Sequence, residues 1–216
     1  MSLATRILLS ALGRLGPRPV ARPGQARRAL PPPQRERGAS LWSSLAKRQS
    51  ARNFSADSLS AREIAQLVWA AAGINRAASR GRTAPSAMNS QEIDLYLACA
   101  DGVYRYEPEG HELILEVELD VRGLCGVQDF VAVAPLELLY VFDPARMKLV
   151  PAADRLRYAA AAAGAMAQNV YLACAALGLE CVVRGWFDGD KLGQALALAA
   201  GRQVLLAQTV GKPPAS

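Results

Sequence analysis

The chain has 216 residues, of which 51% are hydrophobic, so it can bury one sizeable core and a single domain is expected. Its formal net charge of +6 suggests a nucleic-acid partner until the charges are placed along the chain. Residues 1–35 hold seven arginines and no acid, which leaves 18 basic against 19 acidic residues from Glu36 onward. The body is therefore close to neutral and lacks a basic stripe with interleaved aromatic residues, so we expect no nucleic-acid binding.

The start of the chain differs in composition from the rest. Apolar residues at helical spacing over residues 3–15 precede a Pro/Arg-rich run that ends at residues 31–33. This pattern predicts an Arg/Pro-rich tail over residues 1–38 and a folded domain over residues 39–216. The apolar stretch is too short to span a bilayer, so no membrane span is expected. Two interpretations of the tail stay open: a disordered extension of a cytoplasmic protein, or a mitochondrial transit peptide.

Side chains that could carry chemistry on their own are scarce. The four cysteines have no C-x-x-C spacing and lie in apolar or Gly-flanked contexts, which indicates reduced, mostly buried thiols. The single histidine, His111, cannot assemble a zinc site or a Ser-His or Cys-His pair. We therefore predict no metal ligand and no catalytic side chain, and expect a cofactor to carry any chemistry.

Helix signals open the folded part. Ser40 is suited to cap a short helix that ends at Arg48. Ser60 and Glu63 form a capping box, and apolar residues at helical spacing then continue until Gly73 ends the helix. Residues 75–89 lack periodicity, which predicts an exposed loop.

The rest of the chain reads as a buried sheet wrapped by helices. Alternating or continuous apolar runs predict the strands, with a Pro/Gly turn between the second and third of them. An alanine-rich stretch closed by Gly178 predicts a long, buried helix. The sum is an α+β fold with strands at 93–99, 103–106, 113–117, 136–142, 181–183 and 204–210, and helices at 154–177 and 188–196.

An Arg-x-Ser-x-Arg pattern over residues 48–52 is the clearest candidate site. Guanidinium groups match phosphate oxygens two at a time, and the hydroxyl of Ser50 between Arg48 and Arg52 can donate a further hydrogen bond. The same pattern also describes a solvated basic loop. By itself it leaves a phosphate site and an ordinary surface loop open.

Five motifs in order give the chain a resemblance to a known family. It resembles the flavin-dependent nitroreductases, and among them the branch of the thiazoline oxidases and SagB-type dehydrogenases. The resemblance runs from about Leu41 to Pro213. It implies a nitroreductase-like fold, with a central, mostly antiparallel sheet wrapped by helices, in an intertwined homodimer that binds FMN. The motifs are residues 47–54, 82–91, 102–106, 167–169 with 176–179, and 210–213.

The resemblance also implies the residues that would hold FMN. Near the phosphate and the polar edge of the flavin it places Arg48, Gln49, Ser50, Arg52 and Lys212. From the partner subunit it brings a loop that contains Pro85, Ser86, Ala87, Asn89 and Gln91. At the flavin N5 it places backbone N–H groups of Gly185 and Trp186. Without the resemblance, the loop residues are ordinary turn residues, Gly185 a strand-end turn, Trp186 a core aromatic and Lys212 a solvated lysine.

Several positions depart from the family pattern. Gln49 stands where a basic residue is more common, Val183 replaces a common proline, and Arg184 introduces a charge where relatives are often apolar. Residues 162–166 contain neither the acid nor the histidine that SagB-like relatives frequently carry, which argues against thiazoline-oxidase activity. Residues 120–127 are shorter than the corresponding family segment, so any lid over the substrate is expected to be small.

The resemblance implies an FMN-dependent NAD(P)H oxidoreductase. Hydride would pass by a ping-pong cycle from NADH or NADPH through flavin N5 to an unidentified acceptor such as a nitroaromatic compound or a quinone. No Gly-rich dinucleotide fingerprint is present, so the nicotinamide would bind only transiently. The alternative is a flavin-binding protein without turnover, a sensor or carrier that has kept the dimer and the phosphate site.

Overall fold

A computed structural model of the chain describes residues 23–36 and 38–214. Its centre is a seven-stranded sheet with strand order β1-β6-β5-β4-β7-β9-β8, in which every pairing is antiparallel. The α+β fold with a mostly antiparallel sheet is thus confirmed. The strands of this sheet are β1 (Arg27–Ala29), β4 (Ile93–Cys99), β5 (Gly102–Glu107), β6 (Glu112–Val117), β7 (Leu136–Phe142), β8 (Glu180–Arg184) and β9 (Gln203–Gly211).

The helices begin and end where the sequence signals lie. The Ser40 side chain accepts the Ser43 N–H at the start of the first helix, and Ser60 and Glu63 complete the expected capping box at the start of the second. Gly178 ends the long helix with a φ of 71°, a conformation that glycine adopts without steric cost. The helices are α2 (Leu41–Lys47), α3 (Ala61–Ala72), α4 (Ala152–Leu177) and α5 (Gly189–Ala195).

Short elements fill part of the predicted loop over residues 75–89, and here the prediction needs correction. β2 (Ile74–Arg76) and β3 (Gly81–Arg82) form a two-stranded ribbon, and a 3-10 turn follows at Ala87–Asn89. The Arg82 side chain donates to the carbonyl of Ala72 at 2.7 Å and so ties the ribbon to the end of α3. Further 3-10 turns lie at Arg122–Leu124, Asp129–Val131 and Pro144–Arg146.

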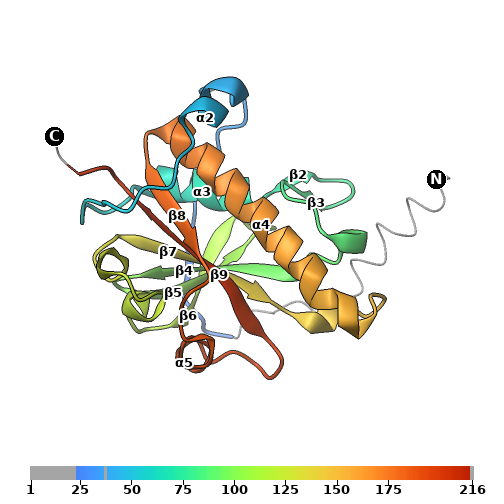
Figure 1. Cartoon of the computed structure of the whole chain (residues 1–216). Helices are drawn as coiled ribbons and strands as arrows, with labels where there is room; N and C mark the ends of the chain where they lie inside the picture. The colour runs from blue at the N-terminus through green and yellow to red at the C-terminus, as the bar shows by residue number, and fades with distance from the viewer. Residues whose placement is uncertain (1–22, 37, 215–216) are drawn as a thin grey trace.

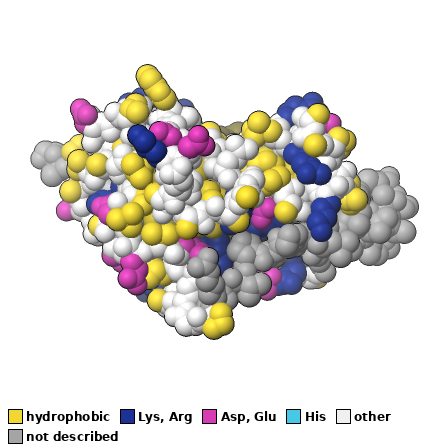
Figure 2. Space-filling view, turned by 90° about the horizontal axis from the view of Figure 1, so that it is seen from below, with side chains coloured by type: hydrophobic (Ala, Val, Ile, Leu, Met, Phe, Trp, Pro, Cys, Tyr) yellow, Lys and Arg dark blue, Asp and Glu magenta, His cyan; other side chains and the backbone are white. Residues whose placement is uncertain are grey.

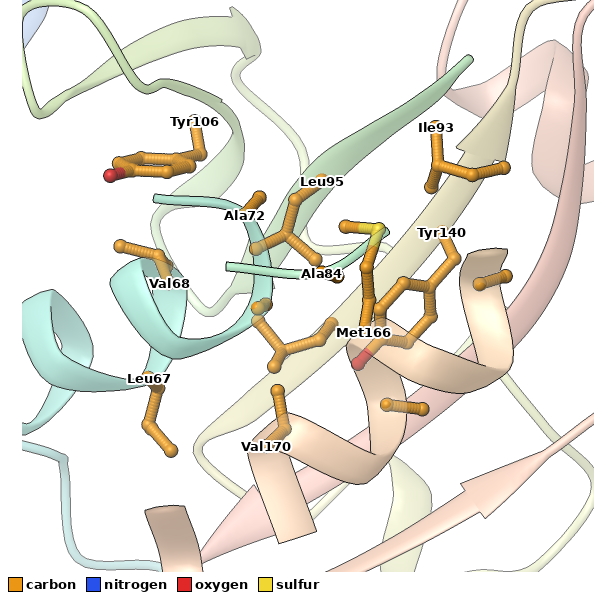
Figure 3. Close-up of a cluster of buried hydrophobic side chains, with 14 of the residues drawn as sticks. Leu67, Val68, Ala72, Ala84, Ile93, Leu95, Tyr106, Tyr140, Met166 and Val170 are labelled. Atoms are coloured by element: carbon orange, nitrogen blue, oxygen red, sulfur yellow. The ribbon is translucent and has the colours of Figure 1, made fainter. Parts of the chain in front are cut away.

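Helix α4 lies across one face of the sheet beside α3, with α2 at its C-terminal end (Figure 1). Leu67 and Val68 of α3, Met166 and Val170 of α4 and Tyr140 of β7 belong to one buried cluster, in which Met166 lies beside Tyr140 (Figure 3). By length and composition α4 could also cross a membrane. Here its buried side chains contact the sheet and α3, which is the packing of a core helix.

A second buried cluster covers the opposite face of the sheet. Leu139 and Val141 of β7 contact Leu192 of α5 and residues of segment 121–133, among them Cys125. All four cysteines are free thiols and three of them are buried, as predicted. The two faces of the sheet are therefore closed by different elements, α3 with α4 on one side and α5 with segment 121–133 on the other.

The described part of the predicted tail belongs to the fold. Arg27–Ala29 pairs with β6, and the Arg27 side chain lies 2.5 Å from Glu112. His111 Nε2 donates to the carbonyl of Pro31 at 2.9 Å, which holds the proline run against the sheet. An edge strand of this kind depends on backbone hydrogen bonds and needs no apolar alternation, so composition alone predicted a tail. The tail and targeting predictions for residues 1–22 lie outside the described residues.

Charged side chains of both signs are interspersed with apolar ones on the face shown in Figure 2. Neither sign forms a continuous stripe across the described part of that face. Among the residues that the structure describes, no group of three His, Cys, Asp or Glu side chains could hold a metal ion.

Candidate functional site

The segment that follows α2 brings the ends of the chain together. Arg48 ends the helix, with its N–H bonded to the Ser44 carbonyl at 2.9 Å, and then adopts an extended conformation. The Ala51 N–H donates to the carbonyl of Cys181 at 3.1 Å, and the Ser55 N–H donates to that of Lys212 at 3.0 Å. Segment 48–55 therefore lies against the start of β8 and the end of β9.

Tyr171 of α4 joins this segment to the sheet. Its hydroxyl lies 2.8 Å from Ser50 Oγ and accepts the Val183 N–H at 2.9 Å. The Arg48 guanidinium carbon lies 5.3 Å from the centre of the same ring, within the range of a cation–π contact. Either hydroxyl can donate in the Ser50–Tyr171 hydrogen bond. Arg48 and Ser50 are thus fixed side by side.

Sequence reasoning missed Tyr171. The only signal was that Tyr171 is the one aromatic residue in the C-terminal half of α4. Gln49 and Arg52 flank Ser50 and are exposed. Gln49 lines a cavity of about 440 Å³ between α2 and the end of α4, together with Lys47 and Tyr171. The cavity at this end of α4 is thus lined by one lysine, one carboxylate from Glu180 and the polar side chains of Gln49 and Tyr171.

The loop at residues 85–91 is held by its own hydrogen bonds. Met88, Asn89 and Gln91 all have positive φ, between 51° and 54°, which is an uncommon conformation for residues other than glycine. The Gln91 N–H donates to Ser86 Oγ at 2.9 Å, and its side-chain amide donates to the Arg80 carbonyl at 2.9 Å and to Asn89 Oδ1 at 3.0 Å. Gln91 is buried and shapes the loop in this structure.

The loop and segment 48–55 lie at different points along α4. Pro85, Ser86 and Gln91 line a cavity together with Ala162 and Met166 of the helix. Ser50 instead contacts Tyr171, which follows Met166 by about 7.5 Å and Ala162 by about 13.5 Å along the helix, at 1.5 Å per residue. The loop at 85–91 and segment 48–55 therefore contact different turns of α4.

Gly185 and Trp186 follow the end of the edge strand β8. Trp186 is 74% exposed, so the interpretation of this residue as a core aromatic is wrong. A Cβ added to Gly185 would meet only the Leu206 side chain, at 4.0 Å, so the space above the backbone at this point is open. A flat ligand can approach the backbone closely here.

Arg184, one residue earlier, carries the charge that departs from the family pattern. Its side chain is 5% exposed and its Nη2 lies 2.5 Å from Oε2 of Glu137, whose side chain is fully buried. Thr209 accepts from Arg184 at 2.7 Å and donates to Glu137 at 2.5 Å. Burial raises the pKa of Glu137 to about 7, while Arg184 opposes that rise. The charge is thus paired inside the protein.

Comparison with known proteins defines the class. The sequence profile of the Nitroreductase family matches residues 45–212, which is most of the chain. The chain therefore belongs to the nitroreductase family and is an oxidoreductase of that family.

Individual relatives agree with this assignment. A crystal structure of a Ralstonia eutropha protein assigned to the nitroreductases is 42% identical, with a TM-score of 0.85 over 94% of this chain and 96% of that one. A Methanocaldococcus jannaschii protein assigned to the nitroreductases is 31% identical over 165 residues, 71% of this chain and 82% of its own length. A chain of the E. coli microcin synthetase complex shares the fold, with 19% identity and a TM-score of 0.70 over 100% of this chain and 83% of that one.

Proposed function

We propose that the protein is an FMN-dependent NAD(P)H oxidoreductase that works as a homodimer. The observation that carries the proposal is the cluster of Arg48, Ser50 and Tyr171. Segment 48–55, which contains Arg48 and Ser50, also contacts Lys212 at the end of β9. Tyr171 binds Val183 of β8, two residues before the open backbone at Gly185. Its location in the cytoplasm remains a prediction, with the mitochondrion as the alternative.

The residues present fit FMN. A phosphate group needs cations and hydrogen-bond donors, and Arg48 supplies a guanidinium near the exposed Ser50, whose hydroxyl can donate. Lys212 carries a second cation, and its backbone lies against segment 48–55, because its carbonyl accepts the Ser55 N–H. The open space above Gly185 suits a planar ring.

When bound, FMN supplies the redox chemistry: it accepts hydride from a nicotinamide and passes electrons to an acceptor. The chain's own residues would bind the cofactor and orient it. Arg48, Ser50 and Lys212 hold the phosphate, while backbone N–H groups at Gly185 and Trp186 are available to stabilise negative charge. Trp186, exposed beside this backbone, offers a surface on which an aromatic acceptor can stack. No side-chain acid or nucleophile is required.

A second copy of the chain would complete the site. The loop at 85–91 and segment 48–55 contact α4 at different turns, and we assign the loop that lies against the flavin to the partner chain. Helix α2 also presents Leu41, Trp42 and Leu45 to solvent, at 58%, 78% and 43% exposure. Apolar surface of this extent on one short helix is typical of an interface.

One observation favours a flavin-binding protein without turnover. The part of α4 that lines the cavity at residues 85–91 contributes Ala162 and Met166, neither of which can donate or accept a proton. If the acceptor needs a proton from the protein, this chain does not supply it there.

The purified protein separates these possibilities. We expect a yellow dimer that releases FMN on denaturation and loses its absorbance near 450 nm when NADH or NADPH is added without oxygen. Bleaching by dithionite but by neither nucleotide would support the sensor or carrier. A colourless dimer that cannot be reconstituted with FMN would contradict both.

A further inference from the structure

Arg184 and Val183 fix the end of β8 from opposite faces of the sheet. The Val183 N–H is held by Tyr171 on the α4 side. The Arg184 side chain points to the other face, where it meets Glu137 of β7 and Thr209 of β9. The last two residues before Gly185 are thus anchored by different elements.

Arg184 also contacts segment 121–133 beneath the sheet. Its Nη1 donates to the Cys125 carbonyl at 3.3 Å, and its guanidinium carbon lies 5.5 Å from the centre of the Phe130 ring. A Cβ added to Gly126 would lie 2.6 Å from Nη1, so the backbone of the segment comes close to the guanidinium. The buried Arg184 guanidinium, which is paired with Glu137, therefore also holds segment 121–133.

The contacts continue to the phosphate cluster. The Phe130 ring lies 5.4 Å from the ring of Phe54, at an interplanar angle of 48°. Phe54 belongs to segment 48–55, which carries Arg48 and Ser50. Arg184, Phe130 and Phe54 thus form a continuous line of contacts from the end of β8 to the segment that would hold the phosphate.

We propose that Arg184 is a positioning residue: its ion pair with Glu137 anchors a guanidinium that holds segment 121–133 and, through Phe130 and Phe54, aligns segment 48–55 with the backbone at Gly185. This inference rests on the proposed function for the identity of the ligand. The clamp itself, defined as Arg184 with Glu137, Thr209, Cys125 and Phe130, is a property of the chain alone.

The chemistry of the pair makes the role specific to arginine. A guanidinium can bond Glu137, Thr209 and the Cys125 carbonyl at once because it has five N–H donors in a fixed plane. A lysine can keep the ion pair with Glu137 but cannot also reach Cys125 in the same geometry. Arg184→Lys should therefore hold segment 121–133 in part, whereas Arg184→Gln should not hold it.

Amide hydrogen exchange on the full-length dimer tests the clamp. In Arg184→Gln we expect amides of residues 121–133 to exchange at least tenfold faster than in the wild type, with an intermediate rate in Arg184→Lys. Arg202→Gln is the matched control, because Arg202, next to the start of β9, is also a mostly buried arginine paired with carboxylates, those of Asp94 and Asp143. It should leave the exchange of segment 121–133 within twofold of the wild type.

A second readout ties the clamp to the ligand site. With FMN as the probe, Arg184→Gln should change the visible circular dichroism of the bound flavin and weaken FMN binding at least fivefold, and Arg184→Lys should restore part of both. Accelerated exchange with an unchanged flavin band and affinity would overturn the positioning role. Unchanged exchange, or acceleration equal to that of the Arg202→Gln control, would overturn the clamp.

The hydrogen-exchange and FMN-binding measurements test the clamp and the proposed function separately. If the wild type binds no FMN, the proposed function fails, whereas hydrogen exchange still decides whether Arg184 holds segment 121–133. If Arg184→Gln does not fold, Glu137→Gln is measured in its place. This variant keeps the shape of the Glu137 side chain and removes its charge. We expect amides of residues 121–133 to exchange at least threefold faster in it than in the wild type. No acceleration in Glu137→Gln would contradict the clamp.

Discussion

The Tyr171 hydroxyl lies 2.8 Å from Ser50 Oγ, although 121 residues separate them in the sequence. The same hydroxyl accepts the Val183 N–H at 2.9 Å. One side chain of the core helix therefore fixes both the hydroxyl proposed to bind phosphate and the strand that leads to Gly185. This relationship makes the site a product of the fold rather than of a local motif.

Replacing Tyr171 with phenylalanine tests this relationship. Tyr171→Phe removes the partner of Ser50 and leaves the Val183 N–H without its acceptor. Since a hydrogen bond contributes about 0.5–1.5 kcal/mol, FMN affinity should fall by about threefold to tenfold. Titration of apo-protein with FMN, followed by quenching of flavin fluorescence, measures the change. Tyr158→Phe, at an exposed tyrosine of the same helix, is the control and should bind FMN as the wild type does.

The positive charges of Arg48 and Lys212 are expected to contribute to FMN affinity. Arg48→Gln combined with Lys212→Gln should weaken FMN binding by up to several kcal/mol, at about 1.5–3 for each charge-assisted hydrogen bond. Binding of riboflavin, which has no phosphate, should change little. Arg62→Gln, at an exposed arginine of α3, serves as the matched loss of charge. Equal losses for FMN and riboflavin would show that these residues do not hold the phosphate.

Glu92 predicts a pH dependence of stability. It is fully buried, and neither carboxylate oxygen has a hydrogen-bond partner among the described residues. Burial raises its pKa from 4.5 to about 7. Because the folded state binds this proton more tightly than the unfolded state, the contribution of Glu92 is favourable below pH 4.5 and is lost as the pH rises to 7. Stability should therefore fall across this window.

The variant Glu92→Gln removes this titration. Relative to the wild type it should gain about 3 kcal/mol of unfolding free energy at pH 8, at about 1.4 kcal/mol per pKa unit, and gain nothing at pH 4.5. Urea unfolding at several pH values measures the difference. Glu118→Gln, at an exposed position, should follow the wild-type curve. A gain that is the same at both pH values would contradict a titrating Glu92.

Two glycines of segment 121–133 give a paired prediction. A Cβ at Gly126 would lie 2.6 Å from Arg184 Nη1, whereas one at Gly123 would meet only the Ala132 Cβ at 3.8 Å. Gly126→Ala should therefore destabilise the protein by about 1–3 kcal/mol through overpacking, and Gly123→Ala should not. Thermal unfolding of both variants measures the difference. Equal melting temperatures would mean that the guanidinium moves aside without cost.

Local signals made much of the fold predictable. The caps at Ser40 and Ser60, the hairpin of β5 and β6, and the end of α4 at Gly178 are all confirmed, because each depends on residues close together in the sequence. Strand β1 was not predictable, since Arg27–Ala29 lacks apolar alternation and pairs with β6 through its backbone.

The site was predictable in its residue types but not in its connections. The Arg-x-Ser-x-Arg pattern indicated a phosphate ligand, yet nothing local indicates that Tyr171 reaches Ser50. The ion pair of Arg184 was not predicted, because its partner, Glu137, lies 47 residues earlier in the sequence. Long-range pairs of this kind follow from the strand order, which a single sequence does not reveal.

Mixed dimers test the central claim most directly. One chain carries Arg48→Gln with Lys212→Gln, the other carries Pro85→Glu in the partner loop, and the two are co-expressed with different tags and purified through both. Neither homodimer should hold FMN, because each lacks one half of both sites. The mixed dimer has one intact site and should hold about one FMN per dimer, against two in the wild type. A mixed dimer without FMN would contradict a site shared between two chains.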